Sequence, residues 1–232
     1  MQPNLLFILV DSLRADKFYG EEKTSITPNI DSFISKGVYL KNNFSSSDGT
    51  VLSWASIFTA LHPFKTGVTG KRLNKISSNV KTYFEILQGF GYNAYSCVPK
   101  IAYAVGLLDN FTNKDRTYPI FTNLGEGLGE KIISKLKLNE MKEPWVFFVH
   151  INDIHFPIKP PKQYDNDEYG TSKYERMVSS IDFWLGKIMK EVDLSKTTVV
   201  ISADHGSYIH NVKLEDKKID FVFDVGANIG QF

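Results

Sequence analysis

Four side chains, drawn from three distant stretches of the sequence, carry groups that bind divalent metal ions. They are Asp11 near the start of the chain, Thr50, and the neighbours Asp204 and His205 near its end. Two carboxylates, one imidazole and one hydroxyl form a mixed oxygen and nitrogen donor set, unlike the thiolates of a structural zinc site. The sequence therefore predicts a site for one divalent ion, which could be Mn, Zn, Mg or Ca.

The two carboxylates each follow an apolar run, which is how an α/β protein builds a site. Leu5–Val10 is continuously apolar, as in a strand buried on both faces of a sheet, and it leads to Asp11. Thr197–Ile201 is a second such run and leads to Asp204 and His205. Ligands bind at the carboxyl ends of strands in such sheets. Asp11 could instead cap a turn, and its position alone leaves both interpretations open.

Thr50 is predicted at the N-terminus of a helix that extends to Leu61, after the turn-rich stretch Ser45–Gly49. Free backbone N–H groups and the helix dipole favour an oxyanion at such a position. A hydroxyl beside them could attack a phosphoryl or sulfuryl group. The commoner role of a threonine here is a helix N-cap, so position alone does not identify a nucleophile.

The remaining apolar spacing predicts an α/β fold with a mostly parallel central sheet sandwiched between helices. Further strands are expected at residues 38–40, 93–98 and 145–149, and further helices at 28–36, 83–90, 129–138 and 174–192. Residues 99–123 show no clear period, and we expect them to form a surface excursion over the site.

Two histidines follow the strand expected at 145–149. A histidine at a strand end can be a metal ligand or a general acid. We interpret His150 as a packed core histidine. His155 lies in the irregular stretch before Pro157 and is the better candidate for function.

Composition excludes some classes of partner. The 232 residues carry a formal charge of +1, which gives no electrostatic reason to expect nucleic acid or an anionic membrane. The single Cys97 cannot form an intrachain disulfide. The apolar run at Leu5–Val10 is far shorter than the roughly 20 residues of a membrane helix. As given, the chain is expected to be cytoplasmic, unless an upstream signal or membrane segment has been removed.

Five ordered motifs resemble the sulfatase-like branch of the alkaline phosphatase superfamily, over roughly residues 3–207. They are Asn4–Asp16, Thr27–Asp31, Ala55–Thr59, Asp153–Pro157 and Ser202–Gly206. The resemblance implies the fold of that superfamily. It also implies a metal-dependent enzyme whose substrate is an anionic ester, either a small molecule or one linked to a glycan or lipid.

The resemblance implies a role for each candidate residue. The metal ligands would be Asp11, Thr50, Asp204 and His205. Thr50 would also be the catalytic nucleophile, and His155 would protonate the leaving oxygen. Asp153 and His155 would contact the substrate. Ser12 stands where many sulfatases carry a second aspartate, which favours a site for a single metal ion.

The stretch Thr50–Trp54 departs from the sulfatase pattern C-x-P-x-R or S-x-P-x-R. Formylglycine cannot be made from threonine, so sulfate-ester hydrolysis by the usual route is not expected. Threonine at this position resembles lipoteichoic acid synthases and phosphoethanolamine transferases. We therefore expect a hydrolase or phosphotransferase that acts on phosphate esters. A sulfuric ester hydrolase and a non-catalytic remnant of the fold are the alternatives.

The end of the chain suggests a second unit. We assign residues 1–210 to a C-terminally truncated catalytic domain, and residues 211–232 to a linker and one strand. Phe221–Phe232 resembles the first strand and glycine turn of an FkbM-type SAM-dependent methyltransferase. We favour a truncated bifunctional fusion over a strand of the catalytic domain with glycines at its exit. One strand and one turn cannot by themselves bind SAM.

Overall fold

The computed structural model describes residues 2–69, 74–103, 105–138 and 140–207. Within them the chain forms a five-stranded sheet in the order β3-β2-β4-β1-β5. All neighbouring strands are parallel. The strands are β1 (Asn4–Val10), β2 (Asn93–Pro99), β3 (Thr117–Tyr118), β4 (Trp145–Ile151) and β5 (Thr197–Ala203). The parallel sheet predicted from the sequence is confirmed.

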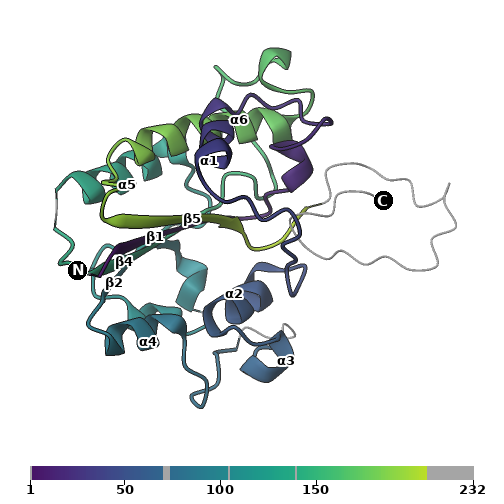
Figure 1. The fold of residues 1–232 in the computed structure, drawn as a ribbon. Helices are drawn as coiled ribbons and strands as arrows, with labels where there is room; N and C mark the ends of the chain where they lie inside the picture. Colours follow the sequence, from purple (N-terminus) through teal and green to yellow (C-terminus); the bar gives the residue numbers. More distant parts are fainter. Residues whose placement is uncertain (1, 70–73, 104, 139, 208–232) are drawn as a thin grey trace, which may run out of the picture.

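Helices cover both faces of the sheet (Figure 1). The helices are α1 (Pro28–Lys36), α2 (Thr50–Thr59), α3 (Pro63–Thr66), α4 (Tyr83–Gly89), α5 (Leu128–Lys137) and α6 (Lys173–Met189). Short 3-10 turns occupy Ala15–Lys17, Lys100–Tyr103, Leu107–Asn110, Leu124–Glu126 and Asp167–Tyr169. Helices α1, α5 and α6 lie on one side, and α2, α3 and α4 on the other.

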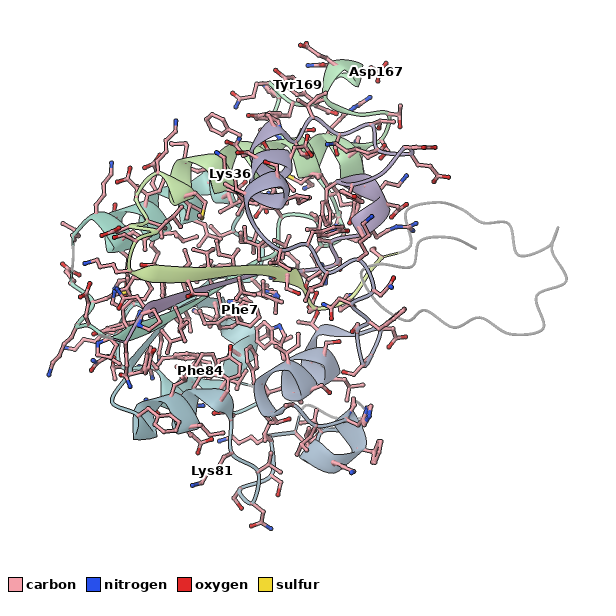
Figure 2. The ribbon with its side chains drawn as sticks, viewed as in Figure 1. Phe7, Lys36, Lys81, Phe84, Asp167 and Tyr169 are labelled. Carbon is pink, nitrogen blue, oxygen red and sulfur yellow. The ribbon has the colours of Figure 1, made fainter. Side chains whose placement is uncertain are left out.

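The two layers of helices create two hydrophobic cores. In β1, Leu6 and Ile8 belong to the core beneath α5 and α6, whereas Leu9 belongs to the core beneath α2 and α4. Figure 2 shows Phe7 of β1 and Phe84 of α4 on the same side of the sheet. The strand sequences are continuously apolar because both faces of the sheet are covered.

The register of the central strands sets the position of the candidate site. Val10, the last residue of β1, pairs with Ile151 of β4 on one side and with Ala203 of β5 on the other. Asp11 and Asp204 each come one residue later. Parallel strands that end in register therefore place both carboxylates at the same edge of the sheet.

Two sequence predictions are wrong. Residues 38–40 form no strand. Val38 and Leu40 are 89% and 67% exposed, so this short segment does not bury the apolar surface that holds a strand in a sheet. Residues 99–123 do not run over the surface. Leu107, Leu108 and Phe111 are buried in the core beneath α4, and β3 pairs with β2. The domain boundary and the methyltransferase-like stretch fall in residues 208–232, outside the described part of the chain, and stay predictions.

The N-terminus of α1 is capped by a side chain from α6. The Asp182 carboxylate accepts hydrogen bonds from the backbone N–H of Asn29 and Ile30, at 3.2 and 2.7 Å, and from the Asn29 side chain at 2.9 Å. Asp182 is buried, so these donors replace its water. Gly186 of α6 leaves room for this side chain, since a Cβ there would overlap the end of the Asn29 side chain in its present position.

We expect Asp182→Ala to lower the free energy of unfolding by about 2 kcal/mol or more, because it leaves the buried Ile30 N–H and the partly buried Asn29 N–H without their acceptor. Urea denaturation monitored by circular dichroism measures the change. Glu130→Ala is the control. It removes an exposed ion pair with Lys187 between α5 and α6, and should cost less than about 1 kcal/mol. Equal losses in the two variants would contradict the capping role.

Candidate active site

Asp11 lies in a tightly held turn after β1. Its backbone N–H donates to the Ile151 carbonyl at 2.8 Å, and its side chain is buried. Ser12 follows with φ 59°, a left-handed conformation that is uncommon for a residue other than glycine. The buried Tyr174 hydroxyl of α6 donates to the Ser12 carbonyl at 2.6 Å and accepts from Arg14 N–H at 2.8 Å. Helix α6 therefore fixes the turn that carries Asp11.

One carboxylate oxygen of Asp204 accepts hydrogen bonds from the backbone, and the other is left available to a ligand. Its Oδ1 accepts from the backbone N–H groups of Ser12 at 3.0 Å and His205 at 2.9 Å. Its Oδ2 is buried and has no hydrogen-bond partner among the described residues. Burial raises the pKa of this carboxyl, but interactions with His150 and His205 and the Ser12 N–H outweigh burial, and the pKa is lowered. Asp204 therefore offers an ionised oxygen.

The tautomer of His205 follows from its neighbour. Its Nδ1 lies 2.6 Å from the Gly206 carbonyl, which can only accept, so Nδ1 carries the hydrogen. When the ring is neutral, it presents a lone pair at Nε2. This nitrogen lies 3.6 Å from Asp204 Oδ2 and 3.2 Å from Thr50 Oγ1. A backbone hydrogen bond of this kind orients metal-binding histidines in general.

Thr50 is the first residue of α2, and the N-cap is Gly49, whose backbone is extended. The threonine is therefore not the N-cap. Its hydroxyl faces the ends of the two strands that lead to Asp11 and to Asp204. Thr50 Oγ1 lies 3.0 Å from Asp11 Oδ2 and 3.2 Å from His205 Nε2. The single hydrogen of the Thr50 hydroxyl cannot be donated to both acceptors at once. The cluster therefore has more hydrogen-bond acceptors than donors.

This cluster fits a divalent ion. Asp11, Asp204 and His205 are all buried, and their ligand atoms lie within 4.8 Å of one another. An unpartnered carboxylate oxygen, an imidazole lone pair and an excess of acceptors are features that a bound cation would satisfy. The structure thus brings together the four predicted ligands, including the Thr50 hydroxyl.

Asp153 and His155 lie in the loop after β4. Asp153 is buried, and its carboxylate accepts from the Leu124 N–H at 3.0 and 3.2 Å. His155 is exposed, and its Nδ1 lies 2.8 Å from the Phe156 carbonyl. Among the described residues, neither belongs to the group that could hold the ion. Their roles toward substrate stay predictions.

His150 lies nearer to the candidate ion site than its interpretation as a core histidine predicted. The residue is fully buried, as predicted for a core histidine, but its Nε2 lies 3.7 Å from Asp204 Oδ2 and 3.9 Å from Asp11 Oδ2. The signal in the sequence was its position. His150 lies near the end of a central parallel strand, and Asp11 and Asp204 directly follow β1 and β5.

Comparison with known proteins gives a family and a fold. A family model described as Sulfatase matches residues 3–222. Among curated proteins, none has a sequence that matches this chain. A Bacteroides thetaiotaomicron protein from a core genetic locus for glycosaminoglycan metabolism superposes with a TM-score of 0.72 at 16% identity, over 93% of this chain and 64% of that protein.

Two other similar structures are named for activities on phosphorus-containing groups. The phosphonate monoester hydrolase of Agrobacterium radiobacter has a TM-score of 0.70 at 15% identity, over 88% of this chain and 63% of that one. The C-terminal periplasmic domain of the phosphoethanolamine transferase EptC from Campylobacter jejuni has a TM-score of 0.65 at 16% identity, over 90% and 70%. These identities show the fold alone. The chain spans less than two thirds of the first two proteins.

No helix in the described part of the chain is long and apolar enough to cross a membrane.

Burial of Asp153 predicts a pH-dependent stability. The pKa of Asp153 is raised from 3.8 to about 7, mainly by burial; the Leu124 N–H opposes the rise and the charge of Glu126 adds to it. The folded protein therefore keeps a proton that the unfolded chain has already lost between these pH values. The unfolding free energy should fall as pH rises from about 4 to 7, by at most about 1.4 kcal/mol per pH unit from this group.

Urea denaturation between pH 4 and 8, with EDTA present, measures this slope. Asp153→Asn keeps an oxygen for the Leu124 N–H and cannot ionise, so its stability should decline less with pH than that of the wild type. Parallel curves for the two proteins would contradict the assignment.

Proposed function

The chain belongs to the sulfatase family, and on that premise we propose that it is a metal-dependent hydrolase or phosphotransferase that attacks phosphate esters through Thr50. One observation carries the proposal. The Thr50 hydroxyl lies at hydrogen-bond distance from two members of the candidate ion site, Asp11 and His205, at the N-terminus of a helix. A nucleophile, an ion site and an oxyanion site therefore coincide.

The residues divide the work of a two-step reaction. Asp11, Asp204, His205 and Thr50 would hold a divalent ion, which would lower the pKa of the Thr50 hydroxyl and polarise a nonbridging oxygen of the ester. Thr50 Oγ1 gives its proton to a solvent water and forms a bond to phosphorus in line with the leaving oxygen. The bond from phosphorus to that leaving oxygen breaks. His155 donates the proton that the leaving oxygen needs.

Helix α2 supports the same step. The backbone N–H groups of Thr50, Val51 and Leu52 precede the first hydrogen bond of the helix, which runs from Ser53 N–H to the Gly49 carbonyl. They have no acceptor inside the helix. These donors and the helix dipole would stabilise charge on the equatorial oxygens of the transferring group. In the second step, water or an alcohol forms a bond to phosphorus, the bond from phosphorus to Thr50 Oγ1 breaks, and the acceptor's proton returns to Oγ1. Water as acceptor gives hydrolysis and an alcohol gives transfer.

Phosphate is favoured over sulfate because position 50 holds neither of the residues that yield formylglycine. Two similar structures are named for phosphonate and phosphoethanolamine chemistry, which supports this preference. The similar structure from a glycosaminoglycan locus favours the alternative, a sulfuric ester hydrolase. The substrate class is an anionic ester, either a small molecule or one linked to a glycan or lipid. A binding module without turnover is the other alternative.

Thr50→Ala should abolish turnover, with kcat lowered by about 10³-fold or more, while the ion stays bound through the two carboxylates and the imidazole. Thr50→Ser keeps a hydroxyl and should retain part of the activity. Steady-state kinetics and metal content, measured by elemental analysis after dialysis, test the pair. Undiminished activity in purified Thr50→Ala would exclude Thr50 as the nucleophile.

A panel of esters separates the candidate activities. p-Nitrophenyl phosphate, bis-p-nitrophenyl phosphate and p-nitrophenyl sulfate are each supplied with Mn, Zn, Mg or EDTA. We expect cleavage of a phosphate ester that depends on metal and is lost in Asp204→Ala together with the metal. Cleavage of the sulfate alone would support the sulfuric ester hydrolase. No cleavage and no retained metal would support the module without turnover.

A further inference from the structure

His150 is a buried polar side chain to which the proposed reaction assigns no part. It is the penultimate residue of β4 and has no exposed surface. Neither of its ring nitrogens has a hydrogen-bond partner among the described residues. Buried polar atoms are rarely left unpaired, because the water they lose is not replaced. An unpaired imidazole inside a strand therefore calls for a partner or a function.

The surroundings of His150 identify the partner. Its Nε2 lies 3.7 Å from Asp204 Oδ2 and 3.9 Å from Asp11 Oδ2. Both distances are longer than a hydrogen bond, but they are short enough for direct electrostatic attraction. Because carboxylates only accept, the nitrogen that faces them carries the hydrogen. Asp204 Oδ2 has no hydrogen-bond partner among the described residues, and Asp11 Oδ2 accepts from the Thr50 hydroxyl. His150 therefore faces carboxylate oxygens of two candidate ion ligands.

The ring cannot turn away from the carboxylates. Trp54 of α2 packs against it edge to face, with the ring centroids 4.6 Å apart and the planes at 83°. The His150 carbonyl accepts from the buried Tyr118 hydroxyl at 2.6 Å. Strand β4 is held between β1 and β2. The imidazole is therefore fixed by packing on its ring and by hydrogen bonds on its backbone.

We propose that His150 is a positioning residue of the metal site, whose Nε2–H lies between Asp11 Oδ2 and Asp204 Oδ2. It draws the two mutually repelling carboxylates together and directs their oxygens toward the ion. His205 approaches Asp204 Oδ2 with a lone pair, whereas His150 approaches it with a hydrogen. The two imidazoles thus have different tasks: His205 binds the ion and His150 orients the oxygens that bind it. This inference rests on the ion site of the proposed function.

The test compares Mn²⁺ affinity in the full chain and its variants, measured from the electron paramagnetic resonance signal of free Mn²⁺. We expect His150→Phe to weaken binding about 10- to 100-fold, as for other groups that orient metal ligands. His150→Gln keeps an N–H donor and should recover part of the loss. His62→Gln, which removes an exposed imidazole stacked on Phe64, should leave the affinity unchanged.

A second readout separates positioning from ligation. At saturating Mn²⁺, pulsed measurements of nitrogen coupling should show one imidazole in the wild type and in His150→Gln, and none in His205→Gln. Thermal unfolding in EDTA shows which variants fold, and if His150→Phe does not, His150→Gln carries the test. Unchanged affinity in the folded His150 variants overturns the inference, as does a coupling lost in His150→Gln. A wild type that binds no Mn²⁺ overturns the ion site itself.

Discussion

The hydrogen bond from Ser12 N–H to Asp204 Oδ1 joins segments 192 residues apart and determines the geometry of the site. It ties the turn after β1 to the turn after β5, which the register of the sheet has already brought to the same level. The second donor to this oxygen, the N–H of His205, fixes the rotation of the carboxylate. Oδ2 is then the one oxygen of Asp204 that remains for a ligand. The rest of the cluster is arranged around that atom.

The surrounding structure prevents this arrangement from relaxing. Tyr174 holds the backbone on either side of Leu13 from the face covered by α6. From the opposite face, the Ser45 hydroxyl contacts the Asp204 carbonyl at 2.6 Å and the Ser53 hydroxyl of α2 at 3.0 Å. Both layers of helices therefore fix the carboxyl ends of the strands. A site of this kind binds an ion with little rearrangement, since its ligands are already held in place.

The strained backbone at Ser12 fits this arrangement. A left-handed conformation is unfavourable for serine, and it persists where the surroundings determine it. Here it turns the Ser12 N–H toward Asp204, while the Ser12 hydroxyl donates to Asp11 Oδ1 at 2.6 Å. One residue thus engages both carboxylates. Asp204 Oδ2 is then left without a partner among the described residues, and Asp11 Oδ2 accepts from the hydroxyl of Thr50, another candidate ligand.

Among the described residues, sequence patterns predicted four of the five strands, five of the six α-helices and the four candidate residues of the ion site. These depend on local rules: continuous apolar runs for strands covered on both faces, helical periodicity, and polar residues at strand ends and helix starts. Only the tertiary structure decided that Thr50 is not the N-cap, that Val38 and Leu40 are exposed rather than part of the sheet, and that His150 faces two carboxylates. Each of these depends on which distant segment lies alongside, and that is set by pairing and packing across the whole chain.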